Sequence, residues 1–192
     1  AALMRGGARL VGKAHMDELA FSVSGENAHY GTLDNPIAPG RTVGGSSSGS
    51  AVCVASGQAD VALGTDTTGS VRVPAAHCGL YGLRPTHGAL SANGVAPLAP
   101  SFDTVGWFAR TPQALAAVGD VLLPPPEDHA GGTAAAYPPK VLLADDCLAR
   151  YQADDERTTA AAHAAALAAA TRLAGGNPEG VTRLSLGAKL LE

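Results

Sequence analysis

The sequence lacks an excess of basic residues and has no long apolar run. Its 192 residues include 13 Lys and Arg against 17 Asp and Glu, a net charge of −4. Because nucleic-acid binding depends on a surplus of positive charge, we expect no nucleic-acid partner. No apolar run approaches the roughly 20 residues that cross a bilayer, and residues 1–12 do not resemble a secretory signal. We therefore expect a cytoplasmic chain with no membrane span.

Cysteine is scarce as well, and its pattern excludes two classes of small domain. The three cysteines are odd in number and far apart, at Cys53, Cys78 and Cys147. They match neither a disulfide framework nor a C-x-x-C metal pair. A reducing compartment fits this pattern, and we expect no metal and no other cofactor.

What the sequence contains is the composition of a globular protein, with 46% hydrophobic and 16% charged residues. Short apolar runs alternate with helical patterns, which is typical of an α/β fold. Buried strands are predicted at 8–13 and 60–64, and further strands at 80–85, 104–109, 140–145 and 182–187. Helices are predicted up to Gly6, from Gly49 or Ser50, at 111–123 and at 154–176, with short helices or turns at 15–20 and 70–78. Residues 22–43 read as a long loop.

The first chemical signal is the stretch "GGSSSGS" at residues 44–50. A phosphate-binding loop would continue with Lys, which is missing here. A flexible linker would not run straight into an apolar helix. Gly45, Ser47 and Gly49 also fit G-x-S-x-G, but that nucleophile elbow follows a buried strand, whereas "DNPIAPGRT" precedes this one. A catalytic loop is the remaining interpretation.

A second serine lies downstream in "LGTDTTGSVRVPAAHCG", residues 63–79. Here a predicted strand ends in a turn of small residues with Ser70 at its tip. Such a turn can direct several backbone N–H groups at one point, which is what an oxyanion hole requires.

Together the two loops resemble the amidase signature family, amide hydrolases with a Ser-Ser-Lys triad. The family patterns G-G-S-S-G-G-S, G-T-D-x-G-G-S-[IV]-R-x-P-[AS]-x-x-C-G and G-[LF]-[KR]-P-[ST] are matched by "GGSSSGS", "GTDTTGSVRVPAAHCG" and "GLRPTHG". The 24 residues from Ser46 to Ser70 also equal the family's spacing. The resemblance runs from about residue 5 to Arg110. It implies a mixed β-sheet covered by helices, with both serine loops at one edge.

The resemblance also implies roles for individual residues. Ser70 would be the nucleophile, and Ser46, held by an unusual cis peptide bond, would relay its proton. The backbone N–H groups of the oxyanion hole would come from Thr67, Thr68, Gly69 and Ser70. Support for the loops would come from Ser47, Asp66 and Arg72. The resemblance gives no catalytic role to His77 or His87, and Cys78, Trp107 and Phe108 are expected in the core.

Two departures from the family pattern bear on activity. Thr68 stands where the family has Gly, and it would be strained if that position needs a positive φ. The triad lysine of the family lies farther ahead of the first loop serine than the 45 residues that precede Ser46 here. Of the three lysines, Lys13, Lys140 and Lys189, the first matches the G-K of the family's "GK-x-x-MDE", which is not the triad lysine. Because losing a general base costs roughly 10²- to 10⁴-fold in rate, we expect the isolated chain to be a weak amidase or inactive.

The organisation expected from this is a single incomplete amidase domain over residues 1–192. It comprises a core with both serine loops (1–123), a Pro/Gly/Ala-rich loop (124–139) and the start of a further α/β segment (140–192). The first residue is not Met, and a helix is already ending at Gly6 and Gly7. We therefore expect a fragment of a longer protein.

Within the family, "SGENAHYGT" and "SFDTVGWFAR" are most similar to plant and green-algal members that hydrolyse indole-3-acetamide. The leading hypothesis is therefore a hydrolase of a small aryl-acetamide, with that amide as its partner molecule and a homodimer left open. One alternative is a non-catalytic receptor or scaffold of the chloroplast-envelope type, which would be plastid-associated. Another is an amidotransferase subunit that acts on charged tRNA.

Overall fold

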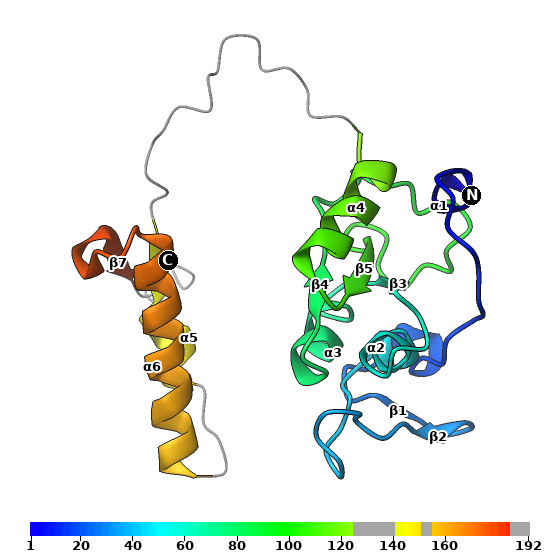
Figure 1. Cartoon of the computed structure of the whole chain (residues 1–192). Helices are drawn as coiled ribbons and strands as arrows, with labels where there is room; N and C mark the ends of the chain where they lie inside the picture. Colours follow the sequence, from blue (N-terminus) through cyan, green and yellow to red (C-terminus); the bar gives the residue numbers. More distant parts are fainter. Residues whose placement is uncertain (125–140, 151–154, 185–192) are drawn as a thin grey trace, which may run out of the picture. The chain divides into compact units, whose positions relative to one another are not determined.

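The computed structural model describes residues 1–124, 141–150 and 155–184. The chain separates into two compact units, Ala1–Asp128 and His129–Glu192 (Figure 1). The expected loop at 124–139 falls almost wholly outside the described residues, and the grouping of both units in one amidase domain stays a prediction. Among the described helices, none is both long and apolar enough to cross a membrane.

The first unit is built on a three-stranded antiparallel sheet with the strand order β3-β5-β4. Its strands are β3 (Val61–Thr65), β4 (Tyr81–Leu83) and β5 (Val105–Ala109). Trp107 of the central strand pairs with Leu63 on one side and with Leu83 on the other. The strands predicted at 60–64, 80–85 and 104–109 are therefore confirmed, and so is the α/β class.

Helices cover both faces of this sheet. Successive side chains of β5 point to opposite faces, so the neighbours Trp107 and Phe108 pack against different helices. The Trp107 indole donates a hydrogen bond of 2.9 Å to a backbone carbonyl of α4 (Pro112–Leu122). Phe108 instead packs in a cluster with apolar residues of α2 (Ser48–Ala55) and α3 (Arg72–His77). Figure 1 accordingly shows α4 on one side of the sheet and α2 and α3 on the other. Trp107, Phe108 and Cys78 are buried as expected.

Local sequence signals set the ends of several helices. The hydroxyl of Thr111 accepts a hydrogen bond from the N–H of Ala114, as expected of an N-cap followed by proline. Helix α1 (Ala2–Arg5) ends at Gly6, also as predicted. Helix α2 begins at Ser48, at least one residue before its predicted start.

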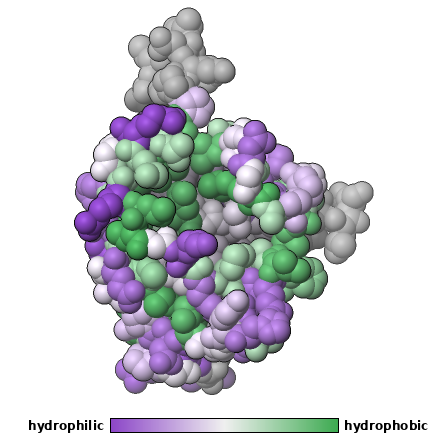
Figure 2. Space-filling view, turned by 90° about the vertical axis from the view of Figure 1, so that its right-hand side faces the viewer, coloured by the Kyte–Doolittle hydropathy of each residue, from purple (hydrophilic) through white to green (hydrophobic). Residues whose placement is uncertain are grey.

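Three predictions in the first unit need correction. Residues 8–13 form no strand and are exposed, and Leu10 keeps 72% of its surface accessible. Strand β3 is only partly buried, since Leu63 is 48% exposed. The predicted loop at 22–43 contains a short hairpin of β1 (Glu26–Asn27) and β2 (Gly31–Thr32), preceded by the 3-10 turn η1 (Glu18–Ala20). Figure 2 shows apolar surface, in green, exposed among polar surface on the face that it draws.

The second unit contains a parallel pair of strands, β6 (Val141–Ala144) and β7 (Val181–Leu184). Along the chain, these two strands are separated by α5 (Asp145–Arg150), α6 (Glu156–Leu173) and the 3-10 turn η2 (Pro178–Gly180). Asp155 caps α6 by accepting a 2.7 Å hydrogen bond from the N–H of Thr158. The predicted strand at 140–145 and helix at 154–176 are confirmed within the described residues, whereas α5 was not predicted. Residues 185–187 of the last predicted strand lie outside them.

Candidate active site

The loop ahead of α2 and the first residue of that helix contain three buried serines, and the loop meets the second serine loop. Ser46 and Ser48 are fully buried, and Ser47 is 5% exposed. The Gly45–Ser46 peptide bond is cis, as the family resemblance implies. The N–H of Ser47 donates a 3.2 Å hydrogen bond to the carbonyl of Ser70. This bond fastens the two serine loops to each other.

Ser47 and Ser50 attach the start of α2 to strand β3. The Ser47 hydroxyl donates to the carbonyl of Thr65 at 3.3 Å and accepts from the Thr65 N–H at 3.2 Å. The Ser50 hydroxyl donates to the carbonyl of Leu63 at 2.7 Å. Both hydroxyls are thereby engaged in backbone contacts. The Ser46 hydroxyl has no hydrogen-bond partner among the described residues.

Asp17 is a buried neighbour of this loop that the sequence did not single out. Its N–H donates to the carbonyl of Ser46 at 3.0 Å, and its Oδ2 accepts from the N–H of Gly25 at 3.0 Å. The carboxylate packs so closely on Gly45 that a Cβ there would lie 2.2 Å from Oδ2. Only glycine fits at position 45 beside this carboxylate. The matched "MDE" segment was the available signal for Asp17.

His15, two residues before Asp17, also contacts the first serine loop and the start of α2. The carbonyl of His15 accepts from the N–H of Gly49 at 2.9 Å, and its Nδ1 lies 3.3 Å from the Ser48 hydroxyl. A Cβ at Gly49 would come within 2.5 Å of the His15 backbone nitrogen. The extended segment around His15 and Asp17 therefore packs directly on the start of α2.

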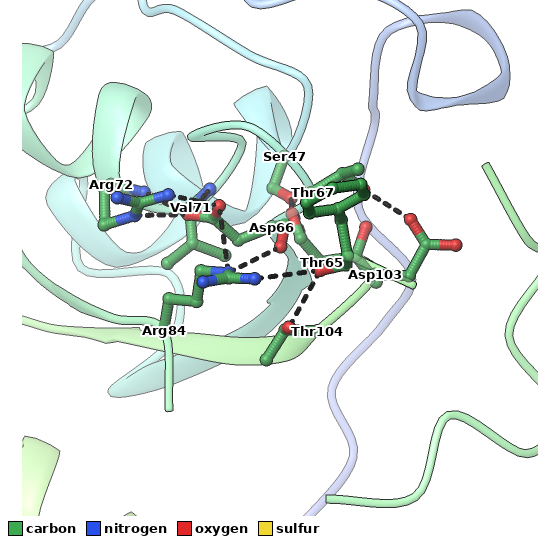
Figure 3. Close-up of polar contacts among 10 residues, drawn as sticks. Ser47, Thr65, Asp66, Thr67, Val71, Arg72, Arg84, Asp103 and Thr104 are labelled. Atoms are coloured by element: carbon green, nitrogen blue, oxygen red, sulfur yellow. Dashed lines mark hydrogen bonds and ion pairs between the residues drawn. The ribbon is translucent and has the colours of Figure 1, made fainter. Parts of the chain in front are cut away.

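Asp66 organises the turn that carries Ser70, as Figure 3 shows. Its side chain is fully buried and accepts from the N–H groups of Val71 and Arg72, each at 3.1 Å. The Arg72 guanidinium donates two further bonds, at 3.0 and 2.9 Å, and Arg84 donates to the Asp66 carbonyl at 3.0 Å. Burial alone would raise the pKa of Asp66, but the hydrogen bonds from Arg72 and Val71 outweigh it and hold the pKa below its ordinary value.

Thr67, the first residue after Asp66, is held by a second carboxylate, that of Asp103. Its hydroxyl donates to Asp103 at 2.6 Å (Figure 3). Asp103 also accepts from the N–H groups of Leu98 and Ala99. Partial burial would raise the pKa of Asp103, but these hydrogen bonds lower it. The turn is thus fixed from both sides, by Asp66 at its base and by Asp103 at Thr67.

Backbone N–H groups stay available at the tip of the turn. Those of Thr67, Thr68, Gly69 and Ser70 donate no hydrogen bond to any described residue, while Ser70 itself is only 4% exposed. Thr68 is exposed and does not have a positive φ, so the condition for backbone strain at this position is not met. The left-handed conformation falls one residue later, at Gly69 with φ of +144°.

The conformations of Thr68 and Gly69 predict different losses of stability for substitutions at these two neighbouring positions. Thr68→Gly should cost less than about 1 kcal/mol of unfolding free energy, since it changes mainly the entropy of the unfolded chain. Gly69→Ala should cost about 2 kcal/mol, because alanine is disfavoured at that φ and its Cβ would lie 3.0 Å from the Val73 side chain. Urea unfolding of both variants measures the two losses of unfolding free energy. Equal losses would contradict the placing of the positive φ at Gly69 and not at Thr68.

Within the part of the chain that the structure describes, neither a lysine nor a group of metal ligands adds to this site. Lys13 is exposed, and Lys140 and Lys189 lie outside the described residues. Across residues 1–124, 141–150 and 155–184, no three His, Cys, Asp or Glu side chains are placed to hold a metal ion.

Comparison with known proteins decides the family. The amidase family model matches residues 1–141. The chain belongs to the amidase family. The rice protein Amidase 1 (Oryza sativa subsp. japonica) is 60% identical over 123 residues, which is 64% of this chain and 28% of the rice protein. This amidase chain therefore spans little more than a quarter of the length of that relative.

Two further relatives with different names also match this chain. Translocon at the outer membrane of chloroplasts 64 of Pisum sativum is 54% identical, over 64% of this chain and 21% of the pea protein. Indoleacetamide hydrolase of Pseudomonas syringae pv. syringae is 51% identical, over 55% of this chain and 24% of the bacterial protein.

A solved structure supports the amidase fold. A crystal structure of an amidase is 32% identical to the chain with a TM-score of 0.77, and the match covers 96% of this chain and 40% of that one. The predicted amidase-signature architecture is thereby confirmed for the part of the family fold that this chain contains.

Proposed function

We propose that the chain carries the acyl-transfer machinery of an amide hydrolase, with Ser70 as nucleophile. The Ser70 oxygen attacks the amide carbonyl carbon, and its proton passes through the Ser46 hydroxyl to the leaving nitrogen. The carbon–nitrogen bond breaks, ammonia leaves, and the acyl group stays on Ser70 as an ester until water releases the acid. The supporting observation is the hydrogen bond from Ser47 to Ser70, because it holds the two serine loops in contact.

The tip of the turn supplies the electrostatic part of this mechanism. Attack on the carbonyl places negative charge on its oxygen, and N–H groups of residues 67–70 would stabilise that charge. These groups have no competing acceptor among the described residues, and Asp66, Arg72 and Asp103 fix the turn without occupying them. An oxyanion hole works best when it is held in place before the reaction, which this support provides.

The proposed substrate is a small aryl-acetamide such as indole-3-acetamide. The identity with Indoleacetamide hydrolase supports this substrate class, and the identity with Amidase 1 supports amide hydrolysis. We expect slow turnover by the isolated chain, because a missing general base costs roughly 10²- to 10⁴-fold in rate.

A second candidate is a non-catalytic scaffold related to the chloroplast translocon protein. The 54% identity with the pea relative favours it. The two candidates differ in one chemical property, since only the enzyme needs a Ser70 that can be acylated.

An activated ester tests the proposal without demanding fast turnover. p-Nitrophenyl indole-3-acetate should release about one equivalent of p-nitrophenol per chain in a burst, leaving an indole-3-acetyl group on the peptide that contains Ser70. Ser70→Ala should lose the burst, whereas Ser91→Ala, at an exposed loop serine, should keep it. A folded chain without a burst would show that Ser70 is not acylated in this chain and would favour the scaffold.

A further inference from the structure

The loop between β4 and β5 contains the only Asn-Gly pair in the sequence, Asn93 and Gly94. Both residues are exposed to solvent. In such a pair the glycine nitrogen can reach the side-chain carbonyl carbon of the asparagine and close a five-membered ring, because glycine has no Cβ to hinder the approach. Asparagine is also one of the thermolabile residue types. The pair therefore has the chemistry for a covalent change that needs no partner protein.

The turn around this pair leaves the reacting groups uncommitted. The N–H of Val95 donates a 3.0 Å hydrogen bond to the carbonyl of Ala92, and the N–H of Asn93 donates to the Ser91 hydroxyl at 3.2 Å. Neither the Asn93 side-chain amide nor the Gly94 N–H forms a hydrogen bond with any described residue. Gly94 has φ of +84°, and a Cβ there would meet no atom within 4 Å. Folding therefore shields neither group.

The other three asparagines of the sequence are protected from this chemistry. The Asn27 side chain is buried, where it donates to the Met16 carbonyl at 2.9 Å and accepts from the N–H of Tyr30 at 2.9 Å. Asn35 and Asn177 are each followed by proline, whose backbone nitrogen has no hydrogen to lose in a ring closure. The reaction is thereby restricted to one position.

We propose that Asn93 is a site of spontaneous deamidation in the folded protein. The Gly94 nitrogen bonds to the side-chain carbonyl carbon, the bond from that carbon to the amide nitrogen breaks, and ammonia leaves with the proton that the Gly94 nitrogen gives up. The product is a cyclic succinimide, which water opens at either of its two carbonyls. One opening gives aspartate, and the other gives isoaspartate, whose main chain runs through the former side chain. Either product makes the net charge of −4 one unit more negative.

The contacts that tie this loop to the Ser70 turn lie after the pair in the chain. Asp103 accepts from the N–H groups of Leu98 and Ala99 and from the Thr67 hydroxyl. The hydrogen bonds of the turn that contains Asn93 stay within residues 91–95. We therefore expect the deamidated chain to stay folded, with the contact between Asp103 and Thr67 intact.

Mass spectrometry of the full chain after incubation in warm, mildly alkaline buffer tests the site. Trypsin releases peptide 73–110, which contains Asn93 and no other side-chain amide. This peptide should gain about 1 Da, because OH replaces NH₂, and an isoaspartyl methyltransferase should methylate part of it. The peptides with the other three asparagines should keep their masses. No gain in peptide 73–110 of the folded chain, or an equal gain in the other peptides, would overturn the proposal.

Two variants and a synthetic peptide test the mechanism and the exposure. Asn93→Gln keeps an amide but needs a six-membered ring, so it should show no gain. Gly94→Ala should slow the gain at least about tenfold, because its methyl group hinders the nitrogen. The folded chain, verified by Trp107 fluorescence, should react within about threefold of the rate of peptide 88–98. A gain that persists in Asn93→Gln, an unchanged rate in Gly94→Ala, or protection by the fold of roughly tenfold or more would overturn the proposal.

Discussion

Replacing Asp66 by alanine is expected to lower the free energy of unfolding of the first unit by about 4 kcal/mol. The substitution removes the acceptor of two backbone N–H groups and of the Arg72 guanidinium at once. Trp107 is the single tryptophan of the chain and is fully buried in this unit. Its fluorescence during urea unfolding therefore reports the change directly.

The exposed pair of Asp60 and Arg110 provides the matched control. Their charged atoms lie 3.2 Å apart, but the Asp60 side chain is 98% exposed. Because water solvates both partners, Asp60→Ala should cost less than about 1 kcal/mol. If the two alanine variants lost similar stability, Asp66 would not be the organising residue of the turn.

The lowered pKa of Asp66 adds a pH dependence to this prediction. A carboxyl group with a lower pKa in the folded state stabilises the protein above its unfolded pKa of about 4 and loses that contribution as the pH falls through the folded value. The stability difference between the unchanged chain and Asp66→Asn should thus be largest near pH 7 and shrink below about pH 4. A difference that stays constant with pH would show that charge plays no part.

The second large effect is expected for Gly45→Ala. The new methyl group would overlap the Asp17 carboxylate, which is buried and bonded to Gly25, so relief requires breaking that contact. We expect a loss of about 3 kcal/mol together with loss of acylation at Ser70. Gly12→Ala is the control, because its Cβ would meet no atom within 4 Å. Normal stability and acylation in Gly45→Ala would show that the close packing against Asp17 is not needed.

Local signals were sufficient for the elements whose ends are set by neighbouring residues. The cap at Thr111 and the stop at Gly6 are contacts between residues a few positions apart, so the sequence reveals them. The apolar run at 8–13 was misread because a strand needs a partner strand, and none of the described strands pairs with it. Helix α5 was missed because it follows β6 directly, without a separating loop.

The candidate site likewise contains residues that the sequence reveals and residues that it does not. The serine loops are contiguous motifs, so the family resemblance located Ser46 and Ser70 from the sequence. The contribution of Asp17 to the first loop and of Arg84 to the turn depends on contacts between segments far apart in the chain. Residue identity alone does not reveal such contacts.

The central claim is that the two serine loops are assembled around a reactive Ser70. The most direct test is the intact mass of the chain after incubation with a fluorophosphonate, which phosphonylates an activated serine and expels fluoride. The account predicts a single adduct that is lost in Ser70→Ala and kept in Ser91→Ala. A chain that is folded by Trp107 fluorescence yet forms no adduct, or keeps its adduct in Ser70→Ala, would contradict it.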